Sequence, residues 1–198
     1  MHLAWELGTF LSAEARPLGD YARGRVLLER SLTLARTSRN RRAEADVLIN
    51  LASNIYNNPR GDLIDNKLEA QVLLKQAQSY YTQRRAPETW AKCAPSEALC
   101  LLFLDNAQNT ADAVDLLEKA RKLRVPGSTD WAYTAMTLGL AYRKLPIATV
   151  GEHKHLLRRA ARLLDGAATV FEFNHMTDHV LKSRIKAVET RLQIPTRA

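Results

Sequence analysis

The sequence is poor in the residues that interrupt regular structure and in those that cross-link it. Its 198 residues include only eight glycines, seven prolines and two cysteines. So few glycines and prolines argue against long disordered tracts. No apolar run approaches the roughly 18–20 residues that a membrane-spanning helix needs. The composition therefore predicts a folded, soluble chain whose partner is not a membrane.

The two cysteines do not form a pattern that predicts a disulfide. Cys93 and Cys100 are seven residues apart. On one helix this spacing corresponds to two turns, about 10 Å along the axis at 1.5 Å per residue, which is too far for a disulfide. We interpret both as small core residues of a reduced protein, which predicts a cytoplasmic location.

A short string recurs four times along the chain. It reads Leu-Leu, two charged or polar residues, then a small residue, and the intervals are 46, 43 and 40 residues. Self-similarity at such a period is typical of a repeat array, whose neighbouring units bury a continuous core. The four strings cover residues 27–31, 73–77, 116–120 and 156–160.

The pattern of apolar residues is helical nearly throughout, because no stretch holds a two-residue alternation for long. Turn sequences fall at the spacing of helical hairpins. We predict an all-α fold, an α-solenoid of about four antiparallel helical hairpins plus a C-terminal capping helix, which forms a single domain over residues 1–198. The predicted hairpins cover residues 2–37, 42–84, 88–124 and 129–171, and the capping helix covers residues 177–192.

Two local features of these helices make specific predictions. Thr110 stands just before one helical segment and Ser128-Thr129-Asp130 just before another, where side chains of these types cap the first turn. The last helix carries one apolar stripe with offsets of four, three and four residues, opposite a charged face. We expect this stripe to pack against the preceding repeat and to close the array. The stripe consists of Leu181, Ile185, Val188 and Leu192.

The segment after residue 130 carries a family pattern. Leu138, Gly139 and Tyr142 follow the spacing Leu-Gly-x2-Tyr, with Trp131 a turn earlier than the pattern places it. Here the chain resembles the tetratricopeptide repeat family. The period of 40–46 residues exceeds the family's 34, so the resemblance is to a divergent array over about residues 2–171. A small residue such as Gly139 lets the paired helix pack close.

This resemblance implies a non-enzymatic scaffold or sensor module that binds a protein or peptide on the concave face of the array. Longer repeats that begin with Trp-Ala resemble arrays in large bacterial proteins, which implies a place in a larger signalling or regulatory assembly. In arrays that grip a peptide carboxylate, Asn50 would match the clamp asparagine. We predict a polar peptide groove around Asn50, Ser53 and Asn54.

The net charge of +8 gathers in four clusters in or after the last turns of second helices. Cations there complement the helix dipole, but in a stacked solenoid they would also form a basic ridge that attracts an acidic protein or peptide. An alternative is a nucleic-acid-associated module that binds through these basic edges. The candidate partner-binding residues of the clusters are Arg39, Arg41, Arg42, Arg84, Arg85, Arg121, Lys122, Arg158 and Arg159.

The sequence contains no recognised catalytic string, such as a glycine-rich phosphate loop, a zinc-protease motif or a nucleophile elbow. His175 and His179 have the i, i+4 spacing that can chelate a metal on a helix, but they fall at the turn into the last helix. An enzyme or metal protein would need His153, His155, His175 and His179 to converge. We therefore expect no catalytic residue, no metal and no cofactor, and the sequence leaves the oligomeric state open.

Overall fold

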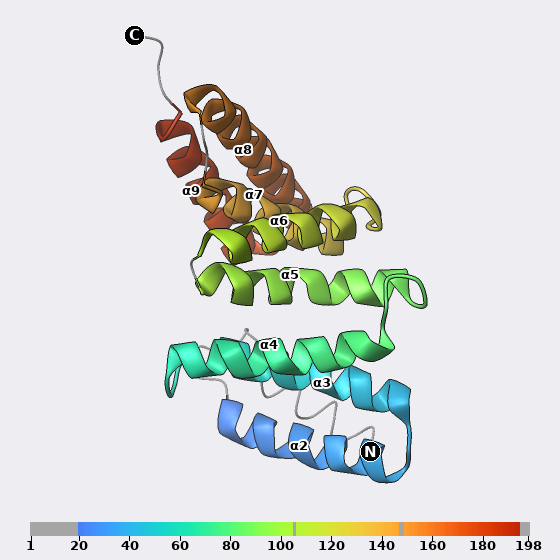
Figure 1. Ribbon diagram of the computed structural model, residues 1–198. Helices are drawn as coiled ribbons and strands as arrows, with labels where there is room; N and C mark the ends of the chain where they lie inside the picture. The colour runs from blue at the N-terminus through green and yellow to red at the C-terminus, as the bar shows by residue number, and fades with distance from the viewer. Residues whose placement is uncertain (1–19, 105, 147–148, 195–198) are drawn as a thin grey trace. The chain divides into compact units, whose positions relative to one another are not determined.

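The computed structural model describes residues 20–104, 106–146 and 149–194. Within these residues the chain forms eight α-helices and no strand (Figure 1), which confirms the predicted all-α class. None of the described helices is both long enough and apolar enough to cross a membrane. The predicted first helix of the 2–37 hairpin lies outside the described residues.

Most helix bounds agree with the prediction within three residues, and those of the last helix agree at both ends. The largest difference is at the end of the fourth predicted helix, which was expected to reach residue 84 and stops at residue 80. The helices are α2 (Tyr21–Thr37), α3 (Arg41–Asn57), α4 (Leu63–Tyr80), α5 (Pro87–Phe103), α6 (Ala107–Lys122), α7 (Thr129–Lys144), α8 (Val150–Phe173) and α9 (Thr177–Leu192).

One of the two predicted caps is confirmed and the other is wrong. Ser128 Oγ accepts a hydrogen bond from the Trp131 backbone N–H at 3.1 Å, at the start of α7. At the start of α6 this role belongs to Asn106, whose side-chain oxygen accepts from the Asn109 N–H at 2.8 Å. Thr110 lies one turn inside α6, buried, and donates its hydroxyl to the Asn106 carbonyl. An asparagine caps at least as well as a threonine, so the helix begins directly after Asn106.

The chain divides into two compact units between Phe103 and Leu104. Unit 1 contains α2 to α5, and unit 2 contains α6 to α9. In each unit consecutive helices pack on one another, the succession expected of a helical solenoid. The boundary falls within the predicted 88–124 hairpin. That hairpin and the single domain over residues 1–198 therefore remain predictions.

The four repeated strings occupy equivalent places in the helices. They lie in α2, α4, α6 and α8, and in each string the second leucine and the small fifth residue are no more than 1% exposed. The first leucine of each string is half-buried. The repeated string therefore marks the same buried packing position in each of the four helices. The buried pairs are Leu28 and Ser31, Leu74 and Ala77, Leu117 and Ala120, and Leu157 and Ala160.

Helices α7 and α8 approach closely at Gly139. A Cβ atom at this position would lie 2.9 Å from Leu164 Cγ and 3.2 Å from the Ala160 carbonyl oxygen. Since Ala160 is the small residue of the repeated string, the two small residues face each other, as the sequence predicted. In unit 1 the corresponding position is Ala52, which is 1% exposed and packs in a cluster with Leu74.

The orientation of α9 corrects one prediction. The helix packs on α8, and its own buried residues are Ser183, Ala187 and Thr190. The predicted stripe faces away from this contact, and its four residues are between 46% and 81% exposed. The expectation that the stripe closes the core was wrong, because small side chains allow a closer helix contact than leucines do. The Thr190 hydroxyl is satisfied within α9 by the Lys186 carbonyl.

Candidate functional site

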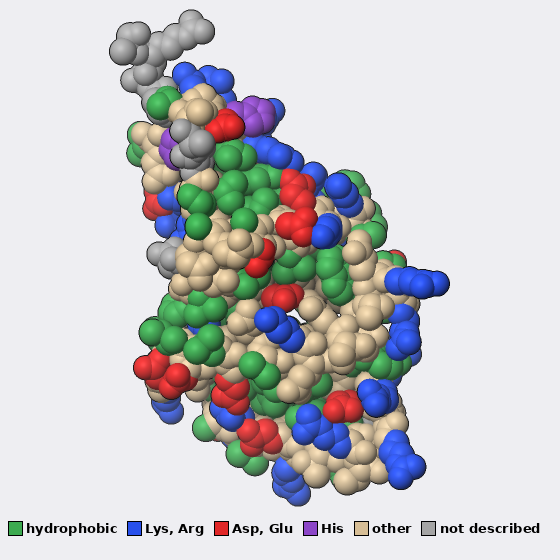
Figure 2. Space-filling view, viewed as in Figure 1, with side chains coloured by type: hydrophobic (Ala, Val, Ile, Leu, Met, Phe, Trp, Pro, Cys, Tyr) green, Lys and Arg blue, Asp and Glu red, His purple; other side chains and the backbone are tan. Residues whose placement is uncertain are grey.

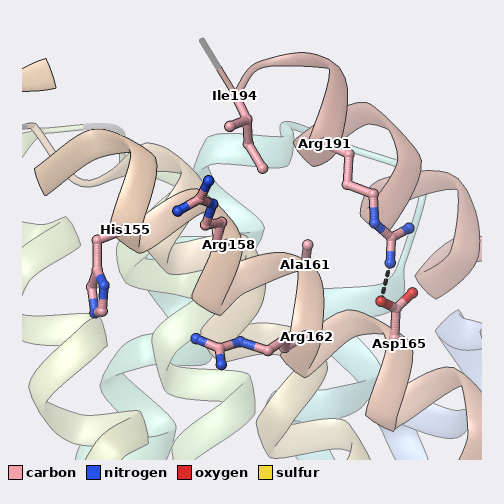
Figure 3. Close-up of a pocket in the computed structure, with 7 residues that line it drawn as sticks. All are labelled: His155, Arg158, Ala161, Arg162, Asp165, Arg191 and Ile194. Carbon is pink, nitrogen blue, oxygen red and sulfur yellow. Dashed lines mark hydrogen bonds and ion pairs between the residues drawn. The ribbon is translucent and has the colours of Figure 1, made fainter. Parts of the chain in front are cut away.

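A hollow of about 580 Å³ lies beside the middle of α8 and the end of α9 (Figure 3). Its α8 residues recur every three or four positions, with the adjacent pair Ala161 and Arg162 in the middle, so they lie on one side of that helix. Two residues at and just beyond the end of α9 complete the lining. The residues of this α8–α9 hollow are His155, Arg158, Ala161, Arg162 and Asp165 from α8, with Arg191 and Ile194.

The α8–α9 hollow carries an excess of positive charge. Arg191 donates to the Asp165 carboxylate, which is the ion pair drawn in Figure 3. Arg158 and Arg162 are exposed, and neither has an acidic partner within the described residues. Three guanidinium groups and one carboxylate leave a formal charge of +2 with His155 neutral. A concave surface with unneutralised cations attracts anionic groups.

Unit 1 contains a smaller hollow of about 300 Å³ among α2, α3 and α4. Here the charge is more nearly balanced, because Arg36 Nε lies 3.0 Å from Glu44 Oε1. Arg41 adds the second cation, which leaves a formal charge of +1. The residues of this α2–α4 hollow are Arg36, Arg41, Glu44, Ala45, Leu48, Gln76, Ser79 and Tyr80.

The other predicted cations of unit 1 lie outside the α2–α4 hollow. Arg39 occupies the turn after α2 with a φ of 52°, and it is exposed. Arg42 is close enough to hydrogen-bond the Tyr81 hydroxyl. Arg84 and Arg85 are exposed in the turn after α4. Of the five basic residues predicted in this unit, Arg41 is the one that lines the α2–α4 hollow.

Two of the predicted cations of unit 2 belong to a structural network. Arg121 Nη2 lies 3.4 Å from Glu118 Oε2, and Arg159 donates to the other oxygen of the same carboxylate. The Tyr142 hydroxyl also donates to Glu118, and the Arg159 guanidinium lies 4.9 Å from the Tyr142 ring centre. These contacts connect α6, α7 and α8, so both arginines stabilise the unit. Lys122 is exposed beside them.

The network also sets the charge state of its carboxylate. Partial burial by itself would raise the pKa of Glu118, but the Tyr142 hydrogen bond and the charges of Arg159 and Arg121 together lower this pKa below the ordinary value. The carboxylate therefore stays ionised and keeps its bonds at neutral pH.

Sequence neighbours were a poor guide to which cations act together. Arg158, Arg159 and Arg162 were predicted as one cluster in or after the last turn of a second helix, but they lie in the middle of α8, and adjacent residues on an α-helix point about 100° apart. Arg158 therefore lines the α8–α9 hollow while Arg159 contacts Glu118. The residues that share the hollow with Arg158 follow at spacings of three and four. They include Arg162, which the sequence placed in the same basic cluster but not among the candidate partner-binding residues.

The predicted polar groove of α3 does not assemble from all three of its residues. Asn54 is 1% exposed, and its Nδ2 donates to the Tyr21 carbonyl at 3.2 Å, which ties α3 to the start of α2. A peptide cannot reach this amide. Asn50 is half-buried and donates to the Asp46 carbonyl one turn earlier at 2.9 Å, and Ser53 is exposed. The groove prediction now rests on Asn50 and Ser53 alone.

One of the two histidines near the start of α9 is used in packing. His179 Nε2 lies 3.0 Å from the Tyr133 hydroxyl, and its ring contacts the Phe171 ring. His175 occupies the turn before α9 with a φ of 57°. Among the described residues, there is no group of three or more His, Cys, Asp or Glu side chains that could hold a metal ion.

Comparison with protein-family models and with curated proteins finds no match for this sequence. The resemblance to tetratricopeptide repeats therefore rests on the repeated strings and the residues around Gly139.

Proposed function

We propose that this chain is a non-enzymatic protein-binding scaffold of divergent tetratricopeptide type, whose α8–α9 hollow holds an acidic peptide segment. The observation that carries this proposal is the pair Arg158 and Arg162, exposed beside a hollow of about 580 Å³ with no acidic partner in the described part of the chain. The four equivalent leucine contacts support the repeat interpretation. A place in a larger signalling or regulatory assembly rests on the family resemblance.

The spacing of the two arginines suggests what such a segment looks like. They are four residues apart on α8, about 6 Å along the helix axis. Carboxylates two residues apart in an extended peptide are separated by about 6.6 Å, so a Glu-x-Glu or Asp-x-Asp segment matches the pair. Each guanidinium can bind a carboxylate through two parallel hydrogen bonds. Ala161 and Ile194 supply an apolar border for the residue between them.

The basic-edge alternative is less well supported by the distribution of charge. On the face of each unit that Figure 2 shows, lysine and arginine side chains are interspersed with aspartate and glutamate. A polyanion binds best to a continuous basic surface, because its affinity depends on the number of phosphates that are neutralised. A mixed surface with a locally unneutralised hollow suits a short acidic peptide better.

The test is fluorescence anisotropy with a labelled Glu-x-Glu-x-Glu peptide, its Gln counterpart and a single-stranded oligonucleotide, at low and high salt. The double variant R158A/R162A should bind the acidic peptide about tenfold more weakly, since two exposed charged contacts of about 0.5–1 kcal/mol each are lost. The control variant R23A/R30A removes the same charge from exposed positions of unit 1.

Three outcomes would contradict the proposal. Equal losses in both double variants would mean that only net charge matters. Equal binding of the acidic and Gln peptides would exclude carboxylate recognition. Tighter binding of the oligonucleotide, with a steep salt dependence, would favour the nucleic-acid alternative.

A further inference from the structure

Helix α9 presents an apolar face that no other described helix covers. The residues of this face are at least 46% exposed, and the helix buries a different set of residues against its own unit. An amphipathic helix normally turns its large apolar side chains inward, so this arrangement needs an explanation. The residues of the α9 outer face are Leu181, Ile185, Val188 and Leu192, with exposed fractions of 61%, 46%, 54% and 81%.

The spacing of the α9 outer face is that of a coiled-coil seam. Offsets of four, three and four residues place Leu181 and Val188 at heptad position d and Ile185 and Leu192 at position a. This is the narrow seam of two positions in seven, whereas a helix packed on a globular core carries a wider apolar stripe. The α9 outer face is therefore shaped to receive one further helix.

The charged residues on either side of the seam determine which partner helix, and which orientation, fits the α9 outer face. In a parallel pair of helices, position g of one faces position e of the other five residues further on. In α9 these positions hold Arg184 and Glu189, so two copies of α9 would form two opposite-charge contacts. In an antiparallel pair Arg184 would instead face Arg191, a like-charge contact. That contact offsets the opposite-charge contact of Lys182 with Glu189 on the other flank. We propose that α9 is a self-association face, on which two copies of this chain pair in parallel and in register.

The two charged side chains that flank the seam are exposed enough to contact a second copy of α9. The side chains of Arg184 and Glu189 are 58% and 40% exposed. Each already has intramolecular partners: Arg184 Nη2 lies 2.6 Å from Glu172, and Glu189 lies 3.1 Å from Arg143 and 2.8 Å from Lys186. The exposed Arg184–Glu172 pair contributes little to stability, and the Glu189 carboxylate can accept further hydrogen bonds beside those from Arg143 and Lys186. Both side chains can therefore be shared with a second copy.

The expected dimer is weak and specific. Because α9 is already folded on α8, pairing involves no cost of forming the helix. A seam of two heptads is smaller than the roughly 800 Å² per partner of a standard interface. We therefore expect a dissociation constant in the high micromolar range for the dimer. The proposed binding of an acidic peptide does not require this dimer and does not change it.

The first experiment is cysteine cross-linking of the full chain. In a parallel pair the two copies of residue 181 are adjacent, whereas in an antiparallel pair they are about 16 Å apart, beyond the reach of a disulfide. L181C alone and L192C alone should each give a covalent dimer on mild oxidation. The native cysteines are buried and give no background, and V150C, exposed on α8, is the control.

Two results of this experiment would overturn the proposal. A dimer that forms only when L181C and L192C are mixed would show an antiparallel pair. The absence of a cross-link above the V150C level would show that the α9 outer face does not pair with itself.

The second experiment is sedimentation equilibrium from low micromolar to millimolar protein. The native chain should approach twice its 22.3 kDa mass. I185E should remain a monomer, while the matched variant V150E should behave like the native chain. R184E should weaken association at least about fivefold, since two ion pairs become repulsive contacts, and R184E/E189R should restore it. Failure of the double variant to recover would contradict the parallel register. Acidic-peptide binding by I185E should be unchanged, so this proposal and the proposed function can fail separately.

Discussion

In unit 1, Glu97 of α5 is only 8% exposed and has a neutral neighbour, the Gln78 side-chain amide, which donates to its carboxylate. Burial raises the pKa of Glu97 above its ordinary value, and the Gln78 bond and the Lys75 charge offset this only in part. In unit 2, Glu118 is also partly buried, but it has a tyrosine and two arginines around it and its pKa is lowered. The comparison shows that burial alone does not set the charge of a carboxyl group; its partners decide.

The two hollows differ in the same way. In the α2–α4 hollow the Arg36 guanidinium is neutralised by Glu44, whereas in the α8–α9 hollow Arg158 and Arg162 have no acid in the described residues. In unit 2, therefore, the charges around Glu118 at the helix contacts form ion pairs, whereas Arg158 and Arg162 at the hollow have no acidic partner in the described residues. This division of roles is what makes the α8–α9 hollow the better candidate site.

The largest expected effect comes from removing a repeated leucine. L157A in unit 2 and L74A in unit 1 should each cost about 2–5 kcal/mol, because both side chains are fully buried. Hydrogen exchange with mass spectrometry should show faster exchange in α7, α8 and α9 for L157A, and in α2, α3 and α4 for L74A. A uniform rise over the whole chain in either variant would show that the two units unfold together.

A smaller effect is expected at the close helix contacts. G139A should destabilise unit 2, because the added methyl group meets Leu164 and the Ala160 carbonyl. Overpacking costs about 1–3 kcal/mol, which exceeds the helix-propensity gain of up to about 1 kcal/mol. Urea unfolding followed by circular dichroism measures the loss.

The control for this contact is G151A, which lies in α8 with nothing within 4 Å of the added atom. It should not destabilise the protein. In unit 1, A52G should cost more than the roughly 1 kcal/mol of helix propensity, because it also removes a methyl group that is buried against Leu74. Equal or higher stability of G139A would mean that α7 and α8 can move apart at no cost.

The smallest predicted effects, on the order of 1 kcal/mol, test the two glutamates. The raised pKa of Glu97 means that its contribution to stability is present at low pH and is lost as pH rises through the folded-state pKa. The lowered pKa of Glu118 has the opposite sign, so its contribution is lost as pH falls below the ordinary value of 4.5. At neutral pH E97Q should therefore stabilise the protein and E118Q should destabilise it.

Urea midpoints at neutral pH and at a pH below the lowered pKa of Glu118 measure both effects. The difference between E118Q and the native chain should shrink at the lower pH, because Glu118 is then protonated. The E97Q difference should shrink there as well, since a protonated Glu97 no longer carries a buried charge. A destabilised E97Q at neutral pH would mean that the Gln78 contact outweighs the cost of burial.

Much of the fold could be predicted from the sequence because the signals are local. The bounds of α9 and the start of α7 follow from a cap and an apolar periodicity within a few residues. The repeated leucine strings identified the buried position of four helices before any contact was known. The candidate site was harder to predict: its residues lie on one helix at spacings that the sequence shows, but the hollow exists only because the end of α9 lies beside them.

The sequence by itself determined the helices, their caps and the repeat, because a helix is stabilised by residues within one or two turns of each other. Only the tertiary structure decided which face of α9 is buried. That helix has both a face of small residues and a face of large apolar residues, and the small-residue face is buried because it packs more closely on α8. The structure likewise separated Arg158 from Arg159, because Arg159 finds its carboxylate 41 residues away in sequence. A contact over that distance depends on how helices pack, which no local pattern encodes.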